Sequence, residues 1–168
     1  GTRFEGGSTI TQQVVKNSVL TKDKTITRKL KEWILSLKIE RVLTKDQILS
    51  IYLNESPYGG NIYGVEEASR TYFGKSSKDL TVSESAYLAA IPQAPTFYSP
   101  YGQNKKKLDD RQKIVLSKMK ELKYISEAEY NLAVKDKVVF LEKNTTGIRA
   151  PHFSMYVRDY LNNKYSFL

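Results

Sequence analysis

The sequence predicts a single, mainly α domain with little or no sheet. Apolar residues recur at helical spacing along most of the chain, three capping-box patterns mark helix starts, and only one short run, residues 138–141, resembles a strand. Of the 168 residues, 40% are hydrophobic and 27% charged, so the chain can form one ordinary globular core.

Eight helices are predicted in order along the chain. Each starts at a glycine, a proline or a small polar residue of the kind that caps a helix. They cover approximately residues 8–20, 25 or 27 to 43, 44–54, 64–73, 81–91, 104–123, a helix that begins at 126, and 151–162.

Three of these starts are capping boxes, in which Ser or Thr caps the helix and Glu or Gln three residues later caps in return. The pairs are Thr44 with Gln47, Thr81 with Glu84, and Ser126 with Glu129. Gly74 is placed to end the fourth helix and Pro151 to begin the last. Residues 57–61 and the proline-rich residues 91–103 are predicted to be irregular connections.

Composition excludes several kinds of site. The chain has no cysteine, which rules out disulfides, thiolate metal sites and a cysteine nucleophile. Its one histidine, His152, makes a histidine-based zinc site or a Ser-His-Asp triad remote. No apolar run approaches the roughly 20 residues of a membrane span, and the polar start at Gly1 lacks a signal peptide. We therefore expect a soluble piece of a longer protein.

Positive charge is concentrated near the beginning of the chain. The formal net charge is +9, and residues 16–45 hold nine Lys/Arg against three acids, a net +6. Such a cluster fits an anionic partner: nucleic acid, an anionic membrane surface or a phosphorylated substrate. A solvated helix face is the plainer interpretation of the same pattern.

Two stretches in this region could carry chemistry. In the first, a glycine pair precedes Ser8, and Ser8, Gln12 and Lys16 recur every four residues as one polar stripe beside Gln13. Amides and an ammonium at a helix start suit phosphate and sugar hydroxyls. The alternative is an ordinary capped surface helix.

In the second stretch, Arg28 and Lys29 precede Glu32 on a helix that we expect to be buried on two sides. One apolar face comprises Leu30, Trp33, Ile34 and Leu37, and the other comprises Leu35, Ile39 and Leu43 with Glu32 beside them. Burial would raise the pKa of Glu32 and the two cations would lower it, so the sequence leaves its direction open. A simple ion pair between Arg28 and Glu32 is the alternative. The next stretch, residues 45–54, is best interpreted as core.

In their order and spacing, these three stretches resemble the family 51 glycosyltransferases, the glycan-polymerising domains of class A penicillin-binding proteins and their monofunctional relatives. Residues 6–13 resemble the family's second motif, 28–32 its third and 45–54 its fourth, while 72–75 and 89–95 resemble later parts of the domain. Residues 150–161 resemble the segment that leaves this domain towards a transpeptidase domain. The resemblance thus divides the chain into a glycosyltransferase domain, 1–148, and an exit helix or linker, 149–168.

The chain departs from the family pattern at two places. The first motif, with the glutamate taken as general base, should lie upstream of Gly6, and Glu5 is not in its context. Ser50 stands where the fourth motif usually has Glu, which we interpret as a loss of local support rather than of chemistry. Because two-acid catalysis needs both acids, we expect the chain as given to bind lipid II weakly without polymerising it.

The resemblance implies a lysozyme-like helical fold that joins lipid II units with inversion and releases a polyprenyl pyrophosphate. Glu32 would be the second acidic residue, either assisting departure of the pyrophosphate or holding the cations and metal of the site. The residues that would bind pyrophosphate and sugars are Ser8, Gln12, Gln13, Lys16, Arg28 and Lys29. Mg²⁺ or another divalent cation could share the charge, although no dedicated metal cage is visible.

The implied partners are lipid II, the growing glycan chain, the membrane surface and phosphoglycolipid inhibitors of the moenomycin type, with no nucleic acid. The implied location is the extracytoplasmic face of the bacterial cell membrane. Three alternatives remain: a lysozyme-like glycan hydrolase, a basic nucleic-acid-binding helical module, and a non-catalytic scaffold that binds lipid II or protein partners.

Overall fold

The computed structural model describes residues 8–18 and 26–143, and these form seven α-helices and one small hairpin. In order, the elements are α1 Ile10–Ser18, α2 Ile26–Val42, α3 Lys45–Glu55, β1 Pro57–Gly59, β2 Ile62–Tyr63, α4 Val65–Phe73, η1 Ser77–Asp79, α5 Val82–Ala90, η2 Ile91–Gln93, α6 Lys105–Glu121 and α7 Glu127–Lys135. The mainly α fold class is therefore confirmed. The helix predicted at 151–162 lies outside the described residues.

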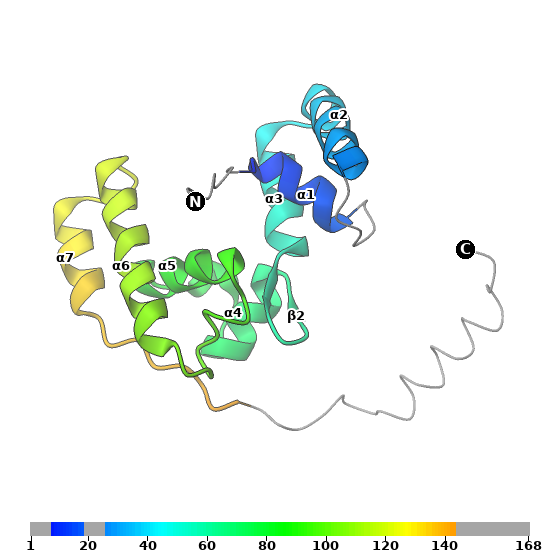
Figure 1. Ribbon diagram of the computed structural model, residues 1–168. Coiled ribbons are helices and arrows are strands. Elements are labelled where there is room, and N and C mark those ends of the chain that lie inside the picture. Colours follow the sequence, from blue (N-terminus) through cyan, green and yellow to red (C-terminus); the bar gives the residue numbers. More distant parts are fainter. Residues whose placement is uncertain (1–7, 19–25, 144–168) are drawn as a thin grey trace, which may run out of the picture.

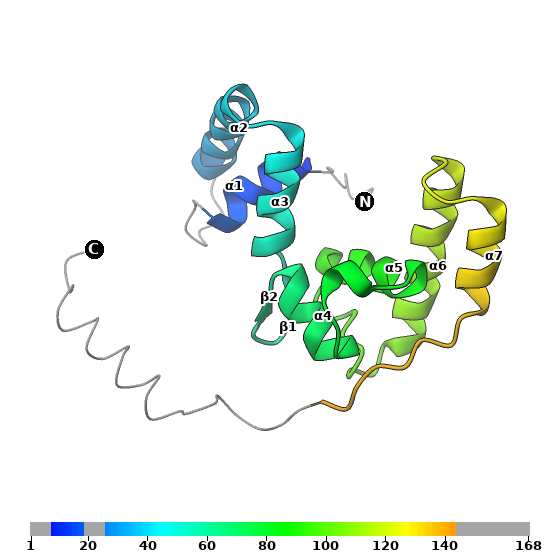
Figure 2. The same cartoon turned by 180° about the vertical axis from the view of Figure 1, so that it is seen from behind.

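The helices form two groups that α3 connects (Figure 1). Helices α1, α2 and α3 form the α1–α3 group, in which α1 packs against both of the others. Helices α4 to α7 form the α4–α7 group, in which α5 and α6 make the most extensive contact. The view from behind shows the β1–β2 hairpin and α4 at the junction of the two groups (Figure 2). Residues far apart in the sequence therefore meet where the groups face each other.

The three predicted capping boxes are all present. At the start of α3, the Thr44 hydroxyl accepts from the Gln47 amide at 3.2 Å, and the Thr44 amide donates to the Gln47 side chain at 2.8 Å. The same reciprocal pairs form before α5 and α7. Each box satisfies two backbone N–H groups that a helix start leaves unpaired. Gly74 ends α4 with a φ of +73°, also as predicted.

The main core lies in the α4–α7 group. Its buried residues are Tyr58, Ala68, Tyr72, Phe73, Tyr87, Leu88, Ala90, Ile91 and Leu108. The Tyr72 hydroxyl donates to the Tyr58 carbonyl at 2.6 Å, and burial raises the pKa of Tyr72 to about 12. Tyr72 therefore remains a protonated donor that ties α4 to the hairpin.

Two predictions of local structure were wrong. Residues 138–141 are extended but do not form a strand, because among the described residues this stretch makes one backbone hydrogen bond, from the Leu141 amide to the Tyr72 carbonyl at 2.9 Å. Phe140 packs on the rings of Tyr72, Phe73 and Tyr87, so this apolar run packs against helices α4 and α5. The predicted loop at 57–61 contains β1 and the turn of the hairpin, in which both glycines have positive φ.

Gly64 fixes the connection between α3 and α4. Its φ is +82°, its amide donates to the Ser56 carbonyl at 3.0 Å, and a Cβ at this position would lie 2.9 Å from the Asn54 carbonyl oxygen. That oxygen belongs to the backbone of α3 and has little freedom to move. A larger residue would therefore separate the two helix groups or distort the end of α3.

We expect Gly64→Ala to lower the free energy of unfolding by roughly 2–4 kcal/mol, because it adds a backbone clash to an unfavourable φ. Urea denaturation measures the loss. Gly60→Ala is the matched control, since Gly60 also has a positive φ (+56°) but no atom within 4 Å of its would-be Cβ. Equal losses in the two variants would contradict the role given to the Asn54 contact.

Candidate active site

Helix α1 is oriented by its buried apolar face. Val14 and Val15 are buried, and the Thr11 hydroxyl donates to the Glu40 carboxylate of α2 at 2.6 Å. These contacts hold α1 between α2 and α3. They leave Lys16 and Asn17 on the exposed side of the helix.

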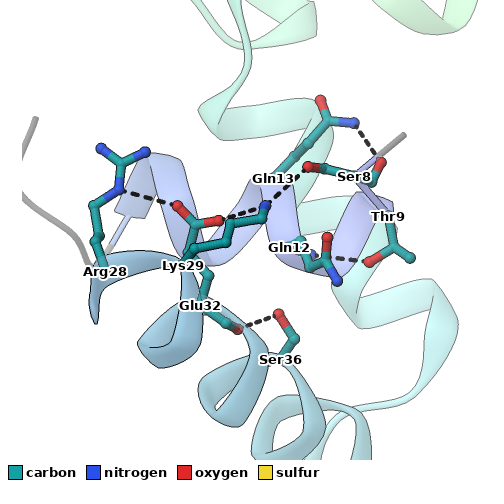
Figure 3. Close-up of polar contacts among 8 residues, drawn as sticks. All are labelled: Ser8, Thr9, Gln12, Gln13, Arg28, Lys29, Glu32 and Ser36. Atoms are coloured by element: carbon teal, nitrogen blue, oxygen red, sulfur yellow. Dashed lines mark hydrogen bonds and ion pairs between the residues drawn. The ribbon is translucent and has the colours of Figure 1, made fainter. Parts of the chain in front are cut away.

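A carboxylate and two cations meet on the face of α2 towards α1 (Figure 3). Glu32 is only 2% exposed; Lys29 Nζ lies 2.8 Å from its Oε2 and Arg28 Nε 3.1 Å from its Oε1. The contact with Lys29 is a hydrogen bond, whereas Oε1 is a buried acceptor without one. Lys29 Nζ also donates to Ser8 Oγ at 3.2 Å. Lys29 thus joins Glu32 to the segment that leads into α1.

The pKa of Glu32 is lowered below its ordinary value of 4.5. The largest cause is the hydrogen bond from Lys29; burial opposes it, and the charges of Lys29, Arg28 and Lys16 lower the pKa further. The cations therefore prevail in the balance that the sequence left open. Glu32 is ionised at neutral pH and serves as a counter-charge that positions its cations.

The apolar face predicted at Leu30, Trp33, Ile34 and Leu37 is not buried. Among the described residues, α2 packs chiefly on α1, so only the side that carries Glu32 and Ser36 is covered. Leu30, Trp33, Ile34 and Leu37 are each about half exposed or more, and we call this surface the apolar face of α2. Periodicity identified the apolar stripe correctly but could not show whether another element covers it.

A cavity of about 620 Å³ lies where the two helix groups face each other. The α1–α3 group contributes side chains from α1 and α3, and the α4–α7 group contributes the end of α5, the following turn and α6. The lining residues are Ser8, Gln13, Lys16, Asn17, Tyr52, Ser56, Pro57, Ala89, Pro92, Gln93, Pro95 and Arg111. Two of them are cations and none is acidic, so the cavity suits a polar, anionic molecule.

The candidate residues fall into two adjoining sets. Ser8, Gln13 and Lys16 line the cavity, whereas Arg28, Lys29 and Glu32 form the cluster beside it, connected through the bond between Lys29 and Ser8. Gln12 is not among the lining residues, and it lies on a different side of α1 from Gln13 in Figure 3.

The structure changes the predicted stripe in two ways: α1 begins at Ile10, and its residues that line the cavity are Gln13, Lys16 and Asn17 rather than Gln12. Ser8 therefore precedes the first turn, and helical spacing does not relate it to Gln12. The Gln13 side chain instead donates to the Ser8 carbonyl at 3.4 Å.

Sequence reasoning missed other residues of the cavity. Tyr52 was assigned to the core, Gln93 lies in a segment predicted to be irregular, and Arg111 lies in the helix predicted over residues 104–123, where no role was assigned to it. No short-range pattern relates these positions to α1. Only the packing of the two helix groups brings them together.

The described side chains do not form a metal site. No group of three or more His, Asp or Glu side chains gathers in residues 8–18 or 26–143, and Glu32 already lies between two cations.

Across the same ranges, no helix is long and apolar enough to span a bilayer.

Comparison with known proteins identifies the family. A family model described as transglycosylase matches residues 1–120. The chain belongs to the transglycosylase family. The resemblance drawn from residues 6–13, 28–32 and 45–54 is thereby confirmed, and at the family level the chain is a peptidoglycan glycosyltransferase domain.

Penicillin-binding proteins are among its relatives. Penicillin-binding protein 1A of Clostridium botulinum (strain Hall) is 45% identical over 146 residues, covering 82% of this chain and 18% of the relative. Penicillin-binding protein 1A of Aquifex aeolicus is 41% identical over 165 residues, covering 98% and 22%. Penicillin-binding protein 1F of Bacillus subtilis is 50% identical over 129 residues, covering 77% and 18%. The chain therefore spans about a fifth of the length of these relatives.

A solved structure supports the fold. The 2.6 Å crystal structure of penicillin-binding protein 1A from Haemophilus influenzae matches with a TM-score of 0.52 and 31% identity, over 94% of this chain and 20% of that one. This agreement is consistent with the mainly α, lysozyme-like fold expected for the family. The predicted domain boundary at residues 148 and 149 stays a prediction, because it lies outside the described residues.

Glu32→Gln removes the negative charge between Arg28 and Lys29 while keeping the shape of the side chain. We expect it to lower the free energy of unfolding at pH 7 by roughly 1–3 kcal/mol. This is less than the loss for a wholly buried pair, because the Lys29 side chain is 57% exposed. Since the folded-state pKa lies below 4.5, the stabilisation is complete above pH 4.5 and disappears as the pH falls through the folded-state value. Urea denaturation at pH 7 and in steps below pH 4.5 measures both effects.

Glu121→Gln is the matched control for that experiment. Glu121 pairs with Lys118 at the same spacing of three residues, but both side chains are 62% exposed. It should change stability by less than about 0.5 kcal/mol. If the two variants lost equal stability, the Glu32 cluster would have no special structural role.

Proposed function

We propose that this domain polymerises lipid II into glycan strands and releases polyprenyl pyrophosphate. The observation that carries the proposal is the ionised Glu32 holding Lys29 against Ser8 at the edge of an acid-free cavity that Lys16 also lines. As the bond between the anomeric carbon and the pyrophosphate breaks, its electrons move to the leaving group. Cations fixed beforehand therefore stabilise the transition state more than the ground state.

Each candidate residue then has a role that follows from its position. Lys16 and Lys29 bind the pyrophosphate, and Ser8 and Gln13 bind phosphate or sugar oxygens; Gln12 is not among the residues that line the cavity. Arg28 and Glu32 hold Lys29 in place. Glu32 is a weak base because its pKa is lowered, so we assign removal of the acceptor's proton to the glutamate of the first motif. The attacking hydroxyl approaches the side of the sugar opposite the pyrophosphate, which inverts the anomeric carbon.

The positive charge of the cluster also affects how Mg²⁺ and a phosphoglycolipid inhibitor would bind. We propose that Mg²⁺, where it takes part, is bound mainly by the diphosphate of the substrate, since Mg²⁺ commonly uses substrate phosphates. A phosphoglycolipid of the moenomycin type offers the same phosphate and sugar groups and would occupy the same cavity.

A lysozyme-like hydrolase is less well supported. It needs a carboxylic acid that stays protonated near neutral pH, and the pKa of Glu32 is shifted the other way. Nucleic acid is disfavoured as a partner, because Lys16 and Lys29 are gathered around a cavity and a buried carboxylate. A non-catalytic scaffold is distinguished by an assay of polymerisation.

The apolar face of α2 supports contact with a membrane. Trp33 and Leu37 are 63% and 58% exposed, and Lys31, Lys38 and Arg41 of the same helix are also exposed. An apolar stripe beside cations is typical of helices that lie in the interface of an anionic bilayer. We propose that this face rests on the extracytoplasmic surface of the bacterial membrane, where the prenyl chain of lipid II is embedded.

Polymerisation of labelled lipid II tests the activity, in a protein that carries the first motif upstream of Gly6. We expect Glu32→Gln to reduce the rate by at least about a hundredfold, because Lys29 and Arg28 lose the charge that positions them. Glu121→Gln serves as the control and should keep the rate. A change under about threefold for Glu32→Gln, or no polymerisation by the unmutated protein, would overturn the proposal.

Trp33 is the only tryptophan, so its fluorescence reports membrane contact directly. We expect its emission to shift to the blue when vesicles of phosphatidylglycerol are added, and Leu37→Glu to weaken this binding at least about tenfold. Ile114→Glu is the matched control, since Ile114 is 57% exposed on α6, in the other helix group. Equal weakening by both variants, or no shift at all, would contradict the orientation proposed for α2.

A further inference from the structure

The proposed function uses the cations of the α1–α3 group and leaves one cation of the cavity unassigned. Arg111 reaches the cavity from α6, whereas Lys16 reaches it from α1. The two residues are thus contributed by opposite helix groups, and no acid lies among the lining residues to neutralise either of them. The contacts of Arg111 itself therefore indicate its role.

Two contacts hold the Arg111 guanidinium at the cavity wall. Its Nε donates to the Ala90 carbonyl at 3.3 Å, and its central carbon lies 5.6 Å from the centre of the Tyr98 ring. Both partners belong to the segment from the end of α5 to the proline-rich turn. They fix the plane of the guanidinium at one edge and one face.

No described residue contacts the other edge of the guanidinium, with its two terminal amino groups, through a hydrogen bond or an ion pair. Asp109, two residues earlier, is already bonded to Tyr87 at 2.8 Å and Lys105 at 3.0 Å. A planar guanidinium with two free amino groups is the side chain best suited to bind two oxygens of a phosphate or carboxylate.

We propose that Arg111 is an oxyanion-binding residue of the substrate cavity and holds a phosphate or carboxylate group from the side opposite Lys16. This inference rests on the proposed function, because it places Arg111 in the cavity that takes lipid II or the growing glycan. The oxyanion is either a phosphate of the diphosphate or a carboxylate of the sugar-linked part of the substrate. In both cases Arg111 fixes the substrate across the cavity from the cluster around Glu32.

The contacts of Arg111 should make the subsite specific for arginine rather than lysine. The contacts with Ala90 and Tyr98 orient the guanidinium before any ligand arrives, so little side-chain entropy is lost on binding. Lysine keeps the charge but has no planar pair of donors and no Nε to reach the Ala90 carbonyl. The subsite should therefore distinguish arginine from lysine, which a general electrostatic attraction would not.

Two probes separate the possible sources of the oxyanion. Inorganic pyrophosphate represents the diphosphate, and N-acetylmuramic acid represents a sugar carboxylate. In low salt, the chain is titrated with each probe while the ¹⁵N–¹H signal of Arg111 Nε is followed by NMR and the affinity is measured by calorimetry. We expect the Arg111 signal to shift with at least one probe, and the responding probe identifies the source.

Variants then test whether Arg111 contributes to binding. For the responding probe we expect Arg111→Met to weaken affinity at least about tenfold and Arg111→Lys by about three- to tenfold. Lys113→Met is the matched control, because Lys113 lies on the exposed side of the same helix but not in the cavity, and it should change affinity less than twofold. Circular dichroism checks that each variant stays folded. The signal of the unmutated protein remains informative if Arg111→Met does not fold.

The inference is overturned if the Arg111 signal moves with neither probe, if Arg111→Met binds like the unmutated protein, or if Lys113→Met weakens binding equally. These results are separate from the assay of polymerisation. Loss of polymerisation in Glu32→Gln together with an unresponsive Arg111 would leave the proposed function standing and remove this subsite. If Arg111 responds to a probe in a protein that does not polymerise lipid II, the Arg111 subsite would stand and the proposed function would be removed.

Discussion

The buried carboxylate of Glu32 is the group on which the arrangement of the candidate site depends. A carboxylate with almost no access to water needs positive charge close by, and Lys29 and Arg28 supply it from the preceding turn of the same helix. This requirement places the Lys29 ammonium where it also reaches Ser8. One local electrostatic constraint thus positions a cation at the edge of the cavity and joins α2 to the segment that leads into α1.

The cavity itself depends on how the two helix groups are connected. Lys16 and Arg111 lie 95 positions apart in the chain, and the path between them runs through α3, the hairpin and the turn at Gly64. The positive φ of Gly64 and its approach to Asn54 set the direction in which α4 leaves α3. A backbone constraint outside the cavity therefore determines whether its two walls face each other.

Local patterns predicted the structure well, and patterns that depend on distant packing did not. The capping boxes at Thr44, Thr81 and Ser126 were predicted correctly because all their atoms lie within four residues. The apolar face of α2 was predicted to be buried, yet burial depends on elements that the sequence does not place. Which face of α1 lines the cavity depended on how α1 packs, and the place of Arg111 depended on the meeting of two helix groups, so neither could follow from spacing alone.

The extended segment at residues 136–143 sets the size of the folding unit. The transglycosylase match ends at residue 120, but Phe140 covers Tyr72, Phe73 and Tyr87 twenty residues later, and Ala133 of α7 closes a second buried cluster. A protein trimmed to the limits of the family match would expose both surfaces to water and become prone to self-association. The smallest piece that keeps both of these surfaces covered is therefore longer than the region matched by the family model, and it includes residues 136–143.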